Sequence, residues 1–138
     1  ALFHKWHENR ADQRGWVHHE LEPEHYRMQF AYPHPAAREL TFYDDGRLVG
    51  VSLCDETPRA LSAAYFYYDP DYARFSLGTL NVLSLLALAA EREKAWLYLG
   101  FWVERCPSLH YKAKFGAAEH LHGRPSNDES PRWAAEIP

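Results

Sequence analysis

Hydrophobic and polar positions along the first part of the chain follow a helical period. Residues 2–14 are polar apart from a short apolar stripe, and Gly15 stands where a helix commonly ends. Residues 22–31 carry two aromatic side chains four positions apart, and Pro23 suits a first helical position. Both segments are predicted to be helices.

The period then changes to the alternation of strands. Residues 39–43 and 48–54 flank an Asp45-Gly46 turn, which is typical of a tight hairpin. Residues 61–68 follow as a third strand. We expect the three strands to pair as an antiparallel meander.

A long helix is predicted after the third strand, ending at about residue 94. Ser76 stands at its start, where a serine hydroxyl can accept hydrogen bonds from backbone N–H groups. Residues 77–90 are apolar on nearly every side, and such a helix is normally covered all round. The C-terminal tail, a missing domain or a second copy could provide this cover.

The rest of the chain predicts a strand, a short helix and a last strand, over residues 95–103, 108–114 and 117–121. The sequence that follows is polar and contains proline, which predicts a flexible tail from which Trp133 can still dock. We therefore expect one domain over residues 1–122 and a tail over residues 123–138.

This succession of elements predicts an α+β fold. It resembles the GNAT-like fold, a mixed sheet flanked by helices. In that fold the sheet splays beside the long helix, and the acyl donor binds where it splays.

Composition excludes several classes of protein. The 138 residues are 46% hydrophobic and 25% charged, as in an ordinary folded domain. A net charge of -4 argues against a protein that coats nucleic acid, although it allows a local basic patch. Cys54 and Cys106 cannot build a disulfide framework, and we find neither a secretion leader nor an apolar run that could span a bilayer. We expect a soluble protein of the reducing cytoplasm, without a membrane partner.

Three motifs are similar to those of one enzyme family. Residues 62–79 match the pattern S-x-x-Y-x-Y-Y-D-P-D-Y-x-x-x-S-L-G-T, residues 98–106 resemble Y-L-G-Y-W-I-x-x-C, and residues 111–115 resemble Y-K-x-x-F. On these motifs the chain resembles the GNAT-like C-terminal domain of arginyl-tRNA and leucyl-tRNA protein transferases.

The resemblance implies an aminoacyltransferase that moves Leu or Arg from charged tRNA to an N-terminal Asp or Glu of a protein. Such a transfer marks the protein for degradation in the N-degron pathway. Charged tRNA is the co-substrate, and no cofactor is implied. The family's N-terminal module, with its cysteine cluster, has no counterpart in these residues, so a missing N-terminal domain or a second copy is an expected partner. The choice between Leu and Arg stays open.

The start of the long helix is predicted to bind the terminal phosphate of tRNA. Positive charge gathers there from Arg74 and from backbone N–H groups, and an anion can approach over Gly78. The alternative is that these residues only cap and pack the helix. The candidates are Arg74, Ser76, Leu77, Gly78 and Thr79.

Aromatic and basic side chains of the motifs are further candidates for substrate binding. Aromatic faces can stack on the terminal adenine, with core packing as the alternative for each. Lysines can pair with an acidic acceptor or a phosphate, or can simply form a solvated helix end. The candidates are Tyr65, Tyr67, Tyr98, Trp102, Tyr111, Lys112 and Lys114.

Aminoacyl transfer needs a neutral amine and a stabilised oxyanion, so one modest base and good positioning should suffice. Carboxylates at predicted strand ends could hold or deprotonate the amine. The candidates are Glu104, Asp55 and Asp69. Glu104 is preferred, and Asp69 could instead only start the Asp-Pro turn.

No metal site is expected. His4 and His7 share a helical face, but no third ligand follows at a fixed spacing, so exposed histidines are the simpler interpretation, as for the His18-His19 pair. Cys106 has no evident His partner and is predicted to be a buried structural cysteine.

Two other functions remain open. An acyl-CoA-dependent GNAT N-acetyltransferase would carry a phosphate loop R-x-x-G-x-G or R-x-x-G-x-A, but Leu77 and Thr79 occupy the matching positions here. A non-catalytic module that binds acidic N-termini is the second alternative.

Overall fold

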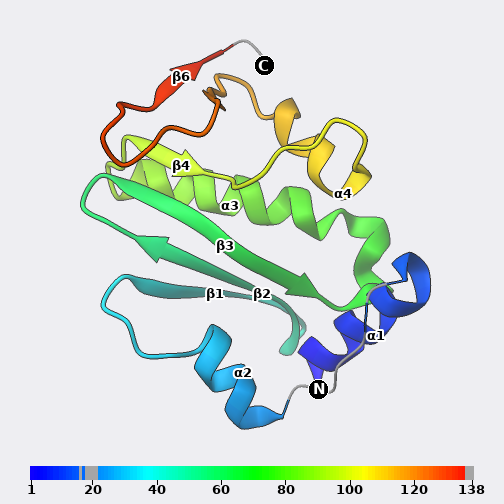
Figure 1. Cartoon of the computed structure of the whole chain (residues 1–138). Coiled ribbons are helices and arrows are strands. Elements are labelled where there is room, and N and C mark those ends of the chain that lie inside the picture. The colour runs from blue at the N-terminus through cyan, green and yellow to red at the C-terminus, as the bar shows by residue number, and fades with distance from the viewer. Residues whose placement is uncertain (16, 18–21, 136–138) are drawn as a thin grey trace. The chain divides into compact units, whose positions relative to one another are not determined.

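A computed structural model describes residues 1–15, 17 and 22–135 (Figure 1). The chain forms two compact units, residues 1–100 and residues 101–138, which we call the first and the second unit. The predicted His18-His19 pair lies outside the described residues.

The first unit begins with two helices, as predicted. Helix α1 (Leu2–Arg14) ends at Gly15, which adopts the left-handed conformation with φ 64° and donates its N–H to Ala11 O. Helix α2 (Pro23–Phe30) has Pro23 in its first turn, where a missing N–H costs nothing.

The next three strands form the predicted meander. Strand β1 (Ala37–Asp44) pairs antiparallel with β2 (Arg47–Glu56), and β2 pairs antiparallel with β3 (Ala60–Tyr68). Asp45 and Gly46 both have positive φ, as a tight hairpin turn requires.

A bulge in β3 decides which of its side chains share a face. Leu53 stands opposite Tyr65 but Cys54 stands opposite Ala63, so Ala64 is the extra residue. Without this extra residue the strict alternation of a strand would place Ser62 and Tyr65 on opposite faces. The bulge brings them to the same face.

A short parallel strand completes this sheet, whose order is β1-β2-β3-β4. Strand β4 (Trp96–Tyr98) pairs with β3 only from Ala60 to Ser62, and β3 then continues to Tyr68. Within the described residues no strand pairs with this later part of the β3 edge. The sheet thus parts after Ser62 and Tyr98, as the GNAT-like fold predicts. We call this place the fork.

Two segments connect β3 to β4. The 3₁₀ helix η1 (Pro70–Phe75) leads into the long helix α3 (Leu77–Glu91), which packs on β3 and β4 (Figure 1). Leu61 of β3 and Leu85 of α3 are fully buried. Leu80, Leu83 and Leu86 are exposed on this helix, and its cover by a missing domain or a second copy stays a prediction.

Ser76 differs from its predicted role at the start of α3. It has φ 54° and ψ 46° and makes no side-chain cap hydrogen bond. A capping hydroxyl needs an extended backbone to reach the first-turn N–H groups, and the left-handed turn from η1 prevents this. Its carbonyl oxygen instead accepts from the N–H groups of Thr79 and Leu80.

The second unit holds the short elements. Helix α4 (Pro107–His110) continues into the 3₁₀ helix η2 (Tyr111–Lys114), close to the predicted helix. Strand β5 (His120–His122) pairs antiparallel with β6 (Arg132–Ala134), which places Trp133 opposite Leu121. The predicted tail therefore contains a strand, because β5 offers it a pairing partner that the local composition does not reveal.

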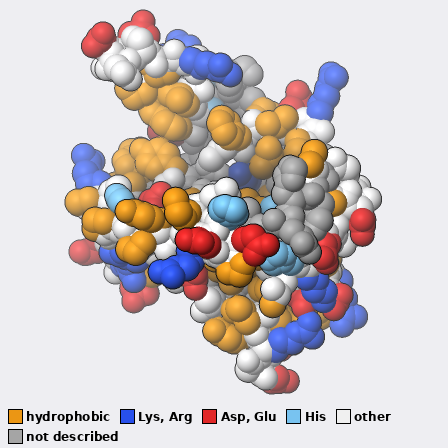
Figure 2. Space-filling model, turned by 60° about the horizontal axis from the view of Figure 1, so that its bottom comes forward, with side chains coloured by type: hydrophobic (Ala, Val, Ile, Leu, Met, Phe, Trp, Pro, Cys, Tyr) orange, Lys and Arg blue, Asp and Glu red, His pale blue; other side chains and the backbone are white. Residues whose placement is uncertain are grey.

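Charge is mixed on the face of the molecule that Figure 2 shows. On the face shown in Figure 2, acidic and basic side chains are interspersed among hydrophobic ones, consistent with a net charge of -4. Among the described helices, none is long and apolar enough to cross a bilayer.

Candidate active site

A recess of about 320 Å³ opens at the fork. Its walls come from the end of β2, the loop between β2 and β3, and the paired parts of β3 and β4. The lining residues are Asp55, Thr57, Arg59, Ala60, Leu61, Ser62, Trp96 and Tyr98. Ser62 and Tyr98 are also the last residues that pair β3 with β4. The recess therefore extends from the β2–β3 loop to the residues at which the fork begins.

Strand register brings two predicted site residues together in this recess. Asp55 stands opposite Ser62, and Ser62 stands opposite Tyr98. Side chains at directly opposite positions project from the same face of a sheet. A carboxylate, a hydroxyl and a phenol thus share one face, an arrangement that can hold an amine and accept its proton.

The Asp55 carboxylate is accessible to a ligand. It is exposed and forms no ion pair with any described residue. The neighbouring Glu56 differs completely, since its side chain bonds to Arg38 at 2.8 Å, Arg92 at 2.6 Å and Lys94 at 3.0 Å. The hydrogen bond from Lys94, followed by that from Arg38, holds the pKa of Glu56 below its usual value.

Hydrogen bonds hold the loop between β2 and β3 at both of its ends. Thr57 N–H donates to Ala60 O at 2.9 Å, and the Thr57 hydroxyl accepts from Ala60 N–H at 3.1 Å. The carbonyl oxygen of Arg59 accepts from the N–H groups of Ala95 and Trp96 at 2.9 and 3.3 Å. The Arg59 backbone is therefore anchored to the start of β4, while its side chain is exposed.

The start of α3 presents the second group of predicted site residues. Arg74 is exposed, lies over the Phe75 ring at 4.6 Å, and forms no ion pair with any described residue. Leu77 is buried, so only its backbone can contact a ligand. First-turn N–H groups without a side-chain cap remain suited to an anion.

Asp69 anchors the turn that leads to α3. Its carboxylate accepts from Lys5 at 2.6 Å, from Arg47, and from Asp71 N–H at 3.1 Å. Burial alone would raise the pKa of Asp69, but these donors together hold that pKa below its usual value. Asp69 has the contacts of the turn-forming alternative, and its catalytic role stays a prediction that these contacts do not support.

Tyr65 and Tyr67 pack against the first two helices. The Tyr65 hydroxyl lies 2.9 Å from His7 Nε2, and the Tyr67 and Tyr26 hydroxyls are 2.7 Å apart. Phe3 contacts both rings, and burial raises the pKa of each phenol. These contacts are those of core packing, the alternative to stacking on a base.

The second unit holds the remaining predicted residues. Trp102 lies against the rings of His110 and His120, with centroids 5.9 and 5.8 Å away. Lys112 donates to Phe101 O at 3.2 Å, and burial lowers the pKa of its ammonium group. Glu104 and Lys114 are exposed, and Tyr111 packs on Phe115.

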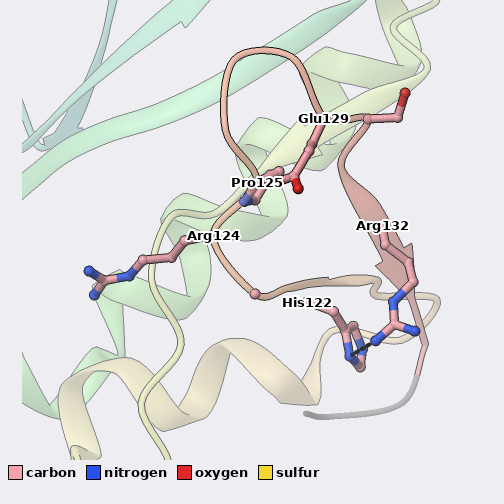
Figure 3. A pocket seen from close by; sticks show the side chains of 7 residues that line it. His122, Arg124, Pro125, Glu129 and Arg132 are labelled. Atoms are coloured by element: carbon pink, nitrogen blue, oxygen red, sulfur yellow. Dashed lines mark hydrogen bonds between the residues drawn. The ribbon is translucent and has the colours of Figure 1, made fainter.

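A second recess, of about 440 Å³, lies in the β5–β6 hairpin (Figure 3). Arg132 and His122 point toward each other, with Arg132 Nη2 3.4 Å from His122 Nδ1, whereas Arg124 points away from this pair. Glu129 also lines it and accepts from Ser126 N–H. Arg124 and Arg132 therefore share this recess with the acidic Glu129, a combination that the sequence interpretation did not anticipate.

Metal and thiol chemistry find no support in the described residues. They contain no group of three His, Cys, Asp or Glu side chains placed to hold a metal ion. Cys54 is a free thiol whose pKa is raised by burial. Cys106 is half-buried rather than buried as predicted, with Sγ 3.3 Å from Ser108 Oγ.

The sequence interpretation missed Arg59, Ser62 and Trp96 as site residues. Ser62 is the first residue of the first family motif, so the motif itself could have identified it as a candidate. Arg59 and Trp96 lie in a turn and a short strand that no motif covers. Only the pairing of Ala60 with Trp96 brings them to one recess.

Comparison with known families gives one match over most of the chain. The family described as "Arginine-tRNA-protein transferase, C terminus" matches residues 1–122. An aspartate/glutamate leucyltransferase of Helicobacter hepaticus is 34% identical over 133 residues, which are 96% of this chain and 55% of that protein. An arginyl-tRNA–protein transferase 1 of Saccharomyces cerevisiae is 40% identical over 76 residues, 55% of this chain and 15% of that protein. The chain thus spans about half the length of the bacterial relatives.

Solved structures support the fold. A ribosomal-protein-alanine N-acetyltransferase of Brucella melitensis has a TM-score of 0.62 at 20% identity, covering 94% of this chain and 88% of that one. The ribosomal-protein-S18-alanine N-acetyltransferase of Escherichia coli has a TM-score of 0.59 at 17% identity, with 94% and 81% covered. At these identities the likeness establishes a shared GNAT-like α+β fold.

Proposed function

The chain belongs to the family of arginine-tRNA-protein transferase C-terminal domains, and from this premise we propose that it transfers Leu or Arg from charged tRNA to proteins that begin with Asp or Glu. The acceptor class follows the name of the bacterial relatives, aspartate/glutamate leucyltransferase. The match over residues 1–122 is the observation that carries this proposal. We place the reaction in the cytoplasm, with charged tRNA as co-substrate and no cofactor.

The donor is proposed to bind along the fork and the start of α3. The later part of the β3 edge has backbone groups that no described strand pairs, and these can bond to the aminoacyl group. Arg74 and the uncapped N–H groups of α3 can hold the terminal phosphate.

The acceptor amine is proposed to lie in the recess at the fork. An α-amino group has a pKa near 8, so roughly a tenth is neutral at pH 7. The Asp55 carboxylate can pair with the ammonium form and take up the proton that it loses. Of the three predicted carboxylates, Asp55 is the one that lines this recess.

The bonds balance without a covalent enzyme intermediate. The amine nitrogen attacks the ester carbonyl carbon, and a C–N bond forms as the C–O bond to the tRNA ribose breaks. One amine proton ends on the ribose oxygen. Positioning of the two substrates supplies most of the rate in such a reaction.

The test is transfer of labelled Leu and labelled Arg from charged tRNA to peptides that begin with Asp, Glu or Ala. We expect transfer to the acidic N-termini only, and a strong loss in Arg74→Ala combined with Gly78→Trp. Arg27→Ala, which changes an exposed arginine of α2, is the matched control and should keep full transfer. The donor that is used decides between Leu and Arg.

Two outcomes would contradict the proposal. Transfer from acetyl-CoA instead of charged tRNA would identify an N-acetyltransferase. Binding of acidic peptides without any transfer, in a folded sample, would identify a non-catalytic module.

If addition of the N-terminal half of a bacterial relative restores transfer, the chain needs that partner. A second copy would instead appear as a dimer by light scattering.

A further inference from the structure

The recess at the fork holds two opposite charges that do not neutralise each other. Asp55 and Arg59 both line it, and neither forms an ion pair with any described residue. Surface charges of opposite sign on neighbouring segments commonly pair. Here a strand end and an anchored loop present them separately to the same space.

Arg59 differs from the neighbouring basic side chains in its contacts. Arg38, Arg92 and Lys94 all bond to Glu56, and Lys94 also donates to Thr57 O at 2.9 Å. These cations are already engaged and do not line the recess. Arg59 is thus the guanidinium group that the recess offers to an incoming anion.

The anchored backbone of Arg59 makes it suitable for recognition. The Thr57–Ala60 turn and the bonds from Ala95 and Trp96 to Arg59 O fix the position from which the side chain extends. A guanidinium group that extends from an anchored backbone can bind a carboxylate through two parallel hydrogen bonds. Trp96 and Tyr98 form aromatic walls beside it.

These features match the two charges of an acidic N-terminal residue. Such a residue carries an α-ammonium group and, a few bonds away, a side-chain carboxylate. We propose that Arg59 binds the side-chain carboxylate of the acceptor's first residue while Asp55 holds its α-ammonium group. Arg59 is then the residue that selects Asp and Glu over neutral N-termini. This inference rests on the proposed function for its substrate, although it concerns binding and not the transfer step.

The recess has a size that suits one or two terminal residues. Its volume of about 320 Å³ lies at the lower end of the range for ligand pockets. A peptide that begins with Asn or Gln has the same shape but lacks the carboxylate charge. It should therefore bind more weakly, since the guanidinium group would lose its water without gaining a charged partner.

The experiment measures binding of fluorescent peptides that begin with Asp, Glu, Asn or Lys to the chain without tRNA. We expect Arg59→Gln to weaken binding of the Asp and Glu peptides about tenfold and to leave the Asn peptide within about twofold. Arg59→Glu should reverse the preference toward the Lys peptide. Arg27→Glu is the matched control, since it changes an exposed arginine outside the recess by the same charge.

Asp55 is tested in the same assay. Asp55→Asn should weaken the binding of every peptide that has a free amino group. Acetylation of the peptide N-terminus should cause the same loss of binding to the wild-type chain. Both side chains are exposed and form no ion pair with any described residue, so we expect each variant to fold, and circular dichroism verifies this.

The outcomes separate this inference from the proposed function. If acidic peptides bind and Arg59→Gln removes their advantage, the inference stands, even when no transfer occurs and the proposed function fails. If transfer proceeds but Arg59→Gln keeps the same preference for Asp and Glu over Asn, the inference is overturned and the proposed function survives. Absence of any preference in the wild-type chain would also overturn it.

Discussion

Replacing Asp69 by Asn separates its two predicted roles. Asp69 is a candidate base in the sequence, whereas the structure places its carboxylate among Lys5, Arg47 and Asp71 N–H. Asn keeps the size of the side chain but removes the charge. We expect Asp69→Asn to destabilise the fold while the folded molecules keep their transfer activity.

The magnitude follows from burial and exposure. The Asp69 side chain is 3% exposed, and hydrogen bonds to a buried charge contribute about 1.5–3 kcal/mol each. Lys5 and Arg47 are 41% and 57% exposed, so solvent screening weakens their part of this contribution. The free energy of unfolding should fall by about 2 kcal/mol, and the Tm by about 8 °C.

The pKa of Asp69 also predicts the direction in which stability changes with pH. The pKa of Asp69 is lower in the folded than in the unfolded state, so the carboxylate stabilises the fold above its usual pKa. This contribution is lost as the pH falls through the lower folded-state pKa. Wild-type stability should therefore fall more steeply below about pH 4 than that of Asp69→Asn.

The assay is urea unfolding followed by circular dichroism, at neutral and acidic pH, beside transfer measured per folded molecule. Asp71→Asn is the matched control, because Asp71 also binds Lys5 but its side chain is 66% exposed. It should change stability by less than about 0.5 kcal/mol. Unchanged stability of Asp69→Asn together with a hundredfold loss of transfer would refute the structural role and restore the catalytic one.

Two further predictions concern helix α3. Leu85→Ala removes a fully buried side chain and should lower the free energy of unfolding by about 2–5 kcal/mol in urea titrations, whereas Leu83→Ala, on the exposed side, should cost less than about 1 kcal/mol. Equal effects would mean that α3 packs through a different face. Ser76→Gly relieves a left-handed residue that makes no cap bond, so the Tm should rise by an amount equivalent to about 1 kcal/mol. A lower Tm would show that the Ser76 hydroxyl is needed.

Local patterns in the sequence were sufficient for most elements of the first unit. Gly15, Pro23 and the Asp45-Gly46 turn have conformational preferences of their own, so helix ends and a hairpin could be placed without knowing their neighbours. Ser76 shows the limit of this reasoning. A serine favours a cap on average, but the turn from η1 fixes its backbone in a conformation from which it cannot cap.

The second unit shows what composition alone cannot decide. The segment after residue 122 is polar, but Arg132–Ala134 still forms a strand because β5 pairs with it. Likewise, residues 95–103 predict a long strand, and only Trp96–Tyr98 finds a partner in β3. Strand formation depends on a partner that can be distant in the sequence.

The candidate site also combines features that the sequence determines with features that only the structure decides. The sequence by itself determined the family, the fold class, and the candidates Asp55, Tyr98 and Arg74, because motifs and residue chemistry are local properties. Only the tertiary structure could distinguish Asp55 from Asp69, since a carboxylate's role depends on what surrounds it. Asp55 lines the recess without an ion pair to any described residue, whereas two cations bind Asp69. Only the structure could bring in Arg59, because strand pairing joins residues that nothing in the sequence connects.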